Sequence, residues 1–258
     1  MLKRVIAVVC ILVLLACFSS CDSAETGVVV TTPIKVAVGI PDSPQFYAAQ
    51  DYTTEKGYEL VKNETMESAI VSVENGKADF VVISSADATN KLLESTSLEW
   101  VENTSYKIDY CAYFNKSNES LKKTFDDAIN ELKKVGTFDA INNAYAKGEN
   151  YQVKPTSYKN GTLRILCSPV FDKLLCFDEK GNLAGKEISV INEICAQLSM
   201  KPEIIIVTEF DELLYKLDMG EGDVVISAME FTEERKEMYL CSDTYMQTTF
   251  GVYKRKTS

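Results

Sequence analysis

The chain has 258 residues, of which 46 % are apolar and 25 % are charged, as is usual for a globular protein with a sizeable core. It contains no histidine, which excludes histidine-based catalytic triads, metal sites and acid–base chemistry. The formal net charge is −11, and so acidic a chain is not expected to bind nucleic acid, because phosphate binding needs a basic surface.

The first residues predict an export signal. Lys3 and Arg4 precede an apolar run over residues 5–16, and this run is too short to span a bilayer as a helix. Such a run is typical of a signal peptide, and the alternative to a lipid-anchored protein is a plainly secreted one.

Two cysteines directly after the apolar run resemble the lipobox of bacterial lipoproteins, in which the thiol is lipidated. Cys21 is the preferred acceptor, because small residues precede it and a polar segment follows, whereas Cys17 has the better leucine three positions before it and is the alternative. We therefore expect a signal peptide over 1–21 and a tether over 22–33, which together predict an extracytoplasmic protein anchored to the membrane of a bacterium.

Five further cysteines lie in the body of the chain, in apolar surroundings and without metal-ligand spacing. Buried and inert thiols are expected, although an exported chain also permits one disulfide, such as Cys167 with Cys176.

The first half of the body alternates between strands and helices, a pattern that predicts a parallel sheet. Strands are expected over 34–40, 58–63, 78–84, 97–102 and 106–116, and helices over 43–57, 66–77, 85–95, 119–136 and 137–148. A polar segment over 149–161 is expected to be a linker.

Alternation restarts after the linker. Strands are expected over 162–168, 202–209, 223–229 and 244–256, helices over 188–199 and 210–222, and a hairpin-like turn over 177–187. The chain therefore predicts an α/β protein with two small units.

The second half resembles the first lobe of bacterial extracytoplasmic solute-binding proteins of family 3, the polar amino-acid type. The most specific part is the string GDVVISAMEFTEERK at 222–236. The first half resembles the other lobe and the terminal helices of the same family, so every part is present once but in rotated order. The resemblance implies a two-lobe, type II periplasmic-binding-protein-like fold with a circularly permuted chain, lobe 2 at 34–105 and lobe 1 at 106–258.

The resemblance also implies a ligand site between the lobes. Arg235 stands where the family has an arginine that binds the α-carboxylate of the ligand, and a planar guanidinium suits that role. A surface arginine paired with Glu233 or Glu234 is the alternative. Other positions of the same motif that face the ligand in the family are Thr232, Ala228 and Glu230, the last of which departs from the more usual Thr or Ser.

Aromatic residues are expected to flank the ligand side chain. Phe171 and Phe210 match such positions, with core packing as the alternative, and Ser168 occupies a position that often carries Asp or Ser.

Lobe 2 departs more from the family pattern. Asp42 and Ser43 stand where a Gly-Thr type pair is usual, and Ser84 stands where an Asp usually binds the ligand's ammonium group. Asp87 lies three residues on and is the expected substitute, together with Glu230 or Asp42; otherwise the ligand is not a plain α-amino acid.

The predicted function is a monomeric receptor that delivers an amino acid or related carboxylate to an ABC transporter permease, without cofactor, metal or catalysis. Two alternatives remain. One is an enzyme on the same fold, similar to prephenate or arogenate dehydratase, with Glu230 as general acid. The other is an accessory ligand-sensing lipoprotein.

Overall fold

The structure is a computed structural model that describes residues 32–153, 156–169, 174–178 and 180–256. One compact unit extends from Pro33 to Ser258. The expected signal peptide, the two lipidation candidates and Phe171 lie outside the described residues, so these expectations stay predictions. Within the described ranges no helix combines the length and the apolar character needed to cross a bilayer.

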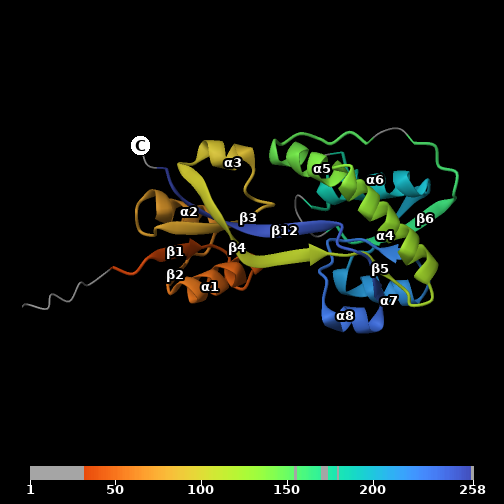
Figure 1. Cartoon of the computed structure of the whole chain (residues 1–258), viewed down its shortest axis with the longest axis horizontal. Coiled ribbons are helices and arrows are strands. Elements are labelled where there is room, and N and C mark those ends of the chain that lie inside the picture. The colour runs from red at the N-terminus through yellow and green to blue at the C-terminus, as the bar shows by residue number, and fades with distance from the viewer. Residues whose placement is uncertain (1–31, 154–155, 170–173, 179, 257–258) are drawn as a thin grey trace, which may run out of the picture. The chain divides into compact units, whose positions relative to one another are not determined.

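The unit contains two five-stranded sheets (Figure 1). The first sheet has the spatial order β2 (Glu59–Lys62), β1 (Lys35–Val38), β3 (Phe80–Ser84), β12 (Met246–Arg255) and β4 (Leu98–Tyr110). The second has the order β11 (Leu240–Cys241), β5 (Tyr113–Phe114), β10 (Val224–Val225), β6 (Thr162–Cys167) and β9 (Lys201–Ile206). A separate hairpin pairs β7 (Cys176–Phe177) with β8 (Leu183–Ala184).

Each sheet is completed by a strand that arrives from the other half of the unit. In the first sheet β1, β2 and β3 are parallel, and β12 joins β3 in the antiparallel sense. In the second sheet β6, β9 and β10 are parallel, and β5, which follows β4 along the chain, joins β10 in the antiparallel sense. The two sheets therefore share one strand order, second–first–third followed by an incoming antiparallel strand.

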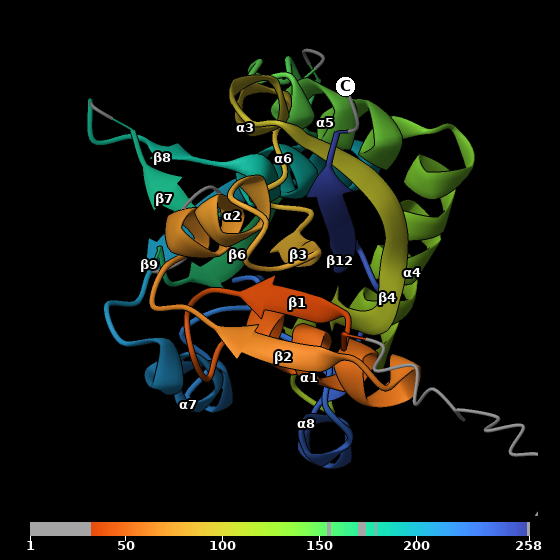
Figure 2. The same ribbon diagram turned by 90° about the vertical axis from the view of Figure 1, so that its left-hand side faces the viewer.

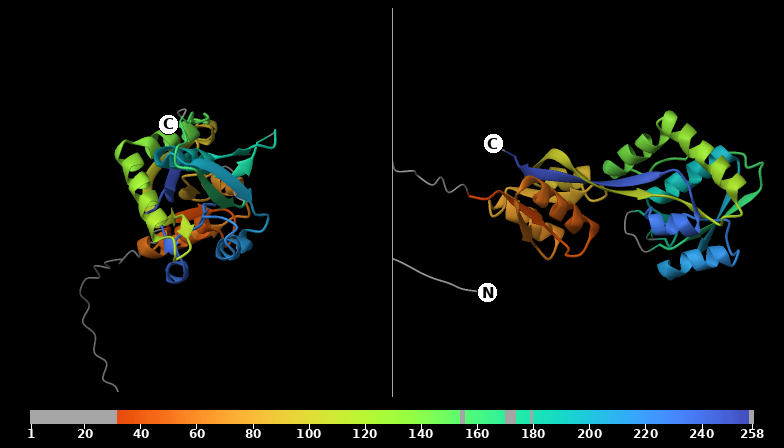
Figure 3. Two further views of the ribbon diagram at one scale, coloured as in Figure 1. Left: turned by 90° about the vertical axis from the view of Figure 1, so that its right-hand side faces the viewer. Right: turned by 60° about the horizontal axis from the view of Figure 1, so that its bottom comes forward.

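The connection between the sheets is made by β4 and β12. These two strands pair along nearly their whole length, from Met246 opposite Tyr110 to Arg255 opposite Leu98, with two register shifts (Figures 1 and 3). The expected division of the chain at 105/106 falls inside β4, and β12 lies in the first sheet although its sequence follows the second α/β unit.

Helices cover both faces of the first sheet, because β1 and β3 are apolar at most positions, apart from Lys35 and Ser84. In β1, which lies beside β2 (Figure 2), Val36 and Val38 pack on the face of α1 (Pro44–Lys56), while Ala37 packs on the face of α2 (Met66–Glu74). A strand buried on both faces is typical of a parallel sheet between helices. A short helix, α3, spans Asn90–Ser95.

The second sheet is covered in the same way. Ile165 and Cys167 of β6 pack with α4 (Glu119–Lys134) and α6 (Lys186–Leu198), whereas Leu166 packs with α7 (Leu213–Asp218). The remaining helices are α5 (Thr137–Ala146), α8 (Glu233–Met238) and the 3-10 turn η1 (Phe210–Glu212).

The expected α/β architecture is confirmed, with differences in detail. The strands expected over 97–102 and 106–116 are one continuous strand, β4, which ends at Tyr110, and β5 begins two residues later as the chain changes sheets. The helix expected over 85–95 is shorter, because residues 85–89 form a turn that Thr89 ends by capping α3. The strand expected over 223–229 pairs only at Val224–Val225.

The cysteines of the body are all free thiols, so Cys167 and Cys176 do not form a disulfide. Burial raises the pKa of Cys111 to about 11 and that of Cys195 to about 12, as expected for inert thiols.

Candidate functional site

Two serines join the loops that follow β6 and β10. The Ser168 backbone N–H donates to the Ser227 hydroxyl at 2.8 Å, and that hydroxyl donates to the Ser168 carbonyl at 3.1 Å. Both serines are completely buried, and the Ser168 hydroxyl donates to the Thr208 carbonyl at 3.4 Å. Ser168 therefore binds the ends of β6, β9 and β10 together, and in this structure its side chain is directed to protein groups.

The predicted guanidinium lies at the start of α8. Thr232 caps this helix, since its hydroxyl accepts from the Arg235 backbone N–H at 3.2 Å. Arg235 Nη1 donates to the Glu230 carbonyl at 2.7 Å, and the Tyr113 hydroxyl donates to the same carbonyl at 2.6 Å. Thr232, Glu230 and Arg235 are thus brought together as the motif predicts.

The guanidinium is not engaged with the acids that flank it in the sequence. Glu233 lies 3.5 Å from Lys236, and no carboxylate of the described residues lies within 4.0 Å of the Arg235 guanidinium. The surface ion pair with Glu233 or Glu234, which the sequence left open, is therefore absent from the described part of the chain. One Arg235 nitrogen is used by a backbone carbonyl, and the described residues supply no anion.

Ala228 and Glu230 differ in burial and in their backbone partners. Ala228 is buried in the left-handed region, at φ 43°, and its N–H donates to Glu187 Oε1 at 2.6 Å, so this N–H has a protein partner. The Glu230 side chain is exposed, and its backbone forms a bridge with Tyr110 of β4. The enzyme alternative needs a buried Glu230, because burial would raise the pKa of a general acid. The Glu230 side chain is not buried.

The loops of the first sheet carry the remaining predicted residues. Ser43 caps α1, since its hydroxyl accepts from Phe46 N at 3.2 Å and donates to the Ile40 carbonyl at 2.7 Å; Asp42 beside it is exposed at φ 60°. After β3, the Ser84 hydroxyl donates to Asp87 Oδ2 at 2.7 Å. Asp87 therefore lies in the turn before α3, three residues ahead of the helix start, and Ser84 holds its carboxylate.

Phe210 begins η1 after β9 and packs, partly buried, against the cluster that contains Leu213 and Leu217. This position agrees with both expectations for Phe210, namely that its ring flanks the ligand side chain or that it packs in the core.

A cavity of about 710 Å³ lies beside these loops. It is lined by residues that follow β3, by the last turn of α5, by the start of α6 and by β12. None of the described residues predicted for the site lines it, although Ser85 and Ala86 follow Ser84 directly.

One buried acid was missed by the sequence interpretation. Glu187 was placed at the end of a hairpin-like turn, but α6 begins one residue earlier, so Glu187 lies in its first turn and is completely buried. Its Oε1 accepts from Ala228 N and from the Tyr245 hydroxyl. Burial raises the pKa of Glu187 to about 7, against these two hydrogen bonds and the charge of Lys186, which lower it. The sequence did hold one signal for this burial, since Glu187 directly precedes the apolar stripe of the helix expected over 188–199.

No cluster of three or more potential metal ligands occurs in the ranges that the structure describes. The arrangement offers one cation, the Arg235 guanidinium, without a carboxylate partner among the described residues, which suits the binding of an anionic group.

Comparisons with known proteins agree with the resemblance seen in the sequence. Residues 163–258 match the family model for bacterial extracellular solute-binding proteins, family 3. The "Arginine-binding periplasmic protein" of Mannheimia haemolytica is 27 % identical over 92 residues, which cover 36 % of this chain and 38 % of that protein. The "Probable histidine-binding protein" of Neisseria gonorrhoeae is 26 % identical over 95 residues, covering 37 % and 35 %.

A solved structure, the arginine-bound form of domain 1 from TmArgBP, is 32 % identical, with 37 % of this chain and 81 % of that chain covered and a TM-score of 0.31. The chain spans less than two fifths of the length of the curated relatives that it matches. The two five-stranded sheets give the chain an α/β architecture, and the two-lobe, type II periplasmic-binding-protein-like fold stays a prediction. The permuted order of its parts stays a prediction.

Proposed function

We propose that the chain is an extracytoplasmic receptor for a small polar solute, because residues 163–258 match the family model for bacterial extracellular solute-binding proteins, family 3. The solute is an amino acid or a related carboxylate, it binds between the two sheet-containing halves, and it is passed to an ABC importer. The relatives named for arginine and histidine support an amino-acid ligand, and the fold class binds ligands at the carboxyl ends of its strands.

The observation that carries this proposal is the set of partners around the Arg235 guanidinium. Its guanidinium is held by the Glu230 carbonyl, which also accepts from the Tyr113 hydroxyl, and it has no carboxylate partner among the described residues. A cation held by neutral groups retains its charge for a ligand carboxylate, and a planar guanidinium binds such a group through two hydrogen bonds.

The ammonium group of an amino acid would need a carboxylate from the other half. Asp87 remains the candidate, because the Ser84 hydroxyl positions it in the turn after β3. Glu230 is the second candidate, since it is exposed and close enough to Tyr106 of β4 for its charge to help raise the pKa of that hydroxyl.

The enzyme alternative has weaker support, since the exposed Glu230 lacks the burial that a general acid of raised pKa needs. Lipid anchoring through Cys21 or Cys17, the monomeric state and the transporter partner stay part of the proposal, as does the alternative of a sensing lipoprotein.

A ligand screen tests the receptor function. The full chain is heated with each of the common L-amino acids and with small mono- and dicarboxylates, and the unfolding midpoint is recorded. A true ligand at 100 times its Kd adds ~2.7 kcal/mol to the free energy of unfolding. If no member of the panel raises the midpoint, the receptor proposal for this ligand class is wrong.

A further inference from the structure

The cavity of about 710 Å³ is formed by segments far apart in the sequence. One side comes from the turn after β3 and the start of α3, and the other from the start of α6, the last turn of α5 and strand β12. The polar groups that line it include Ser85, Thr89, Asn143, Lys186, Gln247 and Thr249.

The charge of this cavity is opposite to that of the chain. The chain carries 38 acidic and 27 basic residues, yet the described residues that line the cavity include two lysines, Lys91 and Lys186, and no acid. Two cations, with no carboxylate among the described lining residues, favour an anion over a cation in the cavity.

Lys186 is the more informative of the two lysines. Burial lowers the pKa of its ammonium group, which means that water compensates its charge only in part. The acid next to it in sequence, Glu187, directs its Oε1 to Ala228 N and the Tyr245 hydroxyl, and no carboxylate of the described chain lies within 4.0 Å of the Lys186 ammonium. A partly desolvated cation in this state gains most from a bound anion.

The start of α6 adds to the same preference. This helix has 13 residues, begins after Gly185 and has no side-chain cap. The Glu187 N–H of its first turn donates to the Leu174 carbonyl at 2.9 Å, and the turn adds the positive end of the helix dipole. A Cβ at Gly185 would lie 2.4 Å from the Leu174 carbonyl oxygen, so the close approach at this corner requires glycine.

Neutral donors complete the lining. The Thr89 hydroxyl accepts from Leu92 N at 3.3 Å, which leaves its own proton to donate. The last turn of α5 brings the amide of Asn143, and the carbonyls of Asn143 and Ala144 in that turn already accept backbone hydrogen bonds from Lys147 and Glu149.

We propose that this cavity is an anion subsite of the receptor, in which Lys186 and Lys91 bind a carboxylate, so that acidic amino acids or small dicarboxylates are preferred over neutral amino acids. The inference rests on the proposed receptor function, because it names the ligand class of that receptor. The proposed ligand has an anionic side chain, whereas arginine, after which one of the relatives is named, has a cationic one.

Isothermal titration of the full chain tests the subsite with L-glutamate, succinate and L-glutamine as probes. L-Glutamate and L-glutamine have nearly the same shape and differ in the charge of one group. We expect at least tenfold tighter binding of L-glutamate than of L-glutamine. Lys186→Gln should bring the two affinities together and weaken succinate at least tenfold, and Lys91→Gln should weaken succinate about threefold.

Two comparisons keep the test decisive. Lys254→Gln removes a lysine that pairs with Glu99 at 3.2 Å on the first sheet, and it should leave all three affinities unchanged. Lys91 is exposed, so its variant is expected to fold even if Lys186→Gln does not.

The outcomes separate this inference from the receptor function. Equal affinities for L-glutamate and L-glutamine in the unsubstituted chain, or an unchanged preference in Lys186→Gln, would overturn the subsite and leave the receptor function standing. Absence of binding by any amino acid or carboxylate would overturn both.

Discussion

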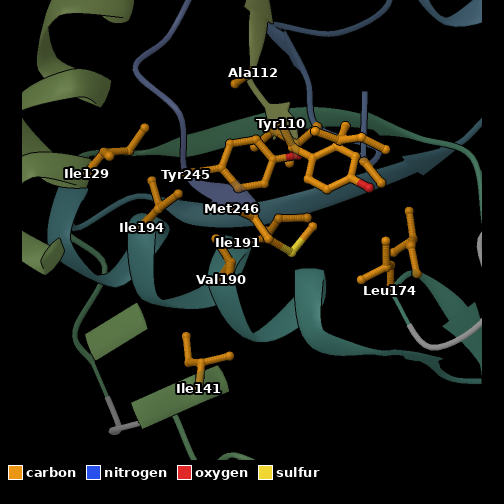
Figure 4. Packing of buried hydrophobic residues seen from close by; sticks show 14 of the residues in the cluster. Tyr110, Ala112, Ile129, Ile141, Leu174, Val190, Ile191, Ile194, Tyr245 and Met246 are labelled. Carbon is orange, nitrogen blue, oxygen red and sulfur yellow. The ribbon is translucent and has the colours of Figure 1, made fainter. Parts of the chain in front are cut away.

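The Tyr245 hydroxyl donates a hydrogen bond to Glu187 Oε1, and both side chains are buried, with exposed fractions of 2 % and 0 %. The bond joins the start of α6 to the segment that leads into β12. Tyr245 lies next to Tyr110 above α6 (Figure 4). Because Oε1 also accepts from Ala228 N, one carboxyl holds three separate segments beside the candidate site.

This carboxyl makes the stability of the protein depend on pH. Burial raises the pKa of Glu187 from 4.5 to about 7, so the folded state holds its proton more tightly than the unfolded state. The stabilisation that protonated Glu187 contributes is therefore fully present below pH 4.5 and is lost as the pH rises from 4.5 to 7. Above pH 7 the free energy of unfolding does not change further through this group. The full change is on the order of 3 kcal/mol.

Glu187→Gln keeps an acceptor for Tyr245 and cannot titrate, so it should remove this slope. Urea unfolding between pH 5 and pH 8 measures it, with Glu94→Gln, an exposed acid of α3, as the matched control. The same slope in Glu187→Gln as in the unsubstituted chain would show that another group is responsible.

Arg235 is expected to bind the ligand carboxylate. Arg235→Ala should weaken the ligand found in the screen by ~10- to 150-fold, since hydrogen bonds to charged groups contribute ~1.5–3 kcal/mol. The variant should still fold, because its hydrogen bond to the Glu230 carbonyl, at 2.7 Å, is local to the start of α8. Lys236→Ala, one position on and paired with Glu233, is the control and should bind normally. An unaltered affinity in Arg235→Ala would refute the carboxylate role.

The packing of α4 on the second sheet tests the assignment of the helices to that half. Phe125 of α4 and Phe114 of β5 meet edge to face, with ring centroids 5.2 Å apart, and both are completely buried. Phe125→Ala should cost ~3–5 kcal/mol of unfolding free energy, as measured in urea. Val135→Ala, at an exposed position after the same helix, should change it by less than ~0.5 kcal/mol. A cost below ~1 kcal/mol at Phe125 would contradict this packing.

The permuted order can be tested by relinking. Val36 of β1 and Lys254 of β12 both pair with Phe80 of β3, so they lie two strand spacings, or ~10 Å, apart. A short Gly/Ser linker between residues 256 and 32, with new ends between Gln152 and Val153, should give a chain of the same near-ultraviolet circular dichroism and ligand affinity.

The control for this experiment carries the same linker and is opened inside β12 after Thr249, which cuts the strand between the residues that pair only with β4 and those that pair with β3. We expect this control to fail to fold. Relinked chains that fail equally at both positions would contradict the permutation as a description of the fold.

The sequence by itself determined the elements whose formation depends on neighbouring residues. Residues 162–168 carry an apolar run at Ile165, Leu166 and Cys167. The stripe of α4 at Phe125, Ile129 and Leu132 repeats with the helical period, so burial at these positions follows from the pattern alone. Arg235 and the hydroxyl of Thr232 were likewise readable from the motif, whereas the capping role of Thr232 came from the structure.

Only the tertiary structure decided which groups are paired across the fold. Whether Arg235 is used by Glu233, whether Ser168 faces a ligand or Ser227, and whether Glu187 is exposed depend on segments 40 or more residues away or on rotamers set by packing. Local propensity carries no information on such partners, because the free energy of a buried polar group depends on the hydrogen bonds that distant segments supply. The lysine-lined cavity has the same origin, since its walls come from α3, α5, α6 and β12, which are far apart in the sequence.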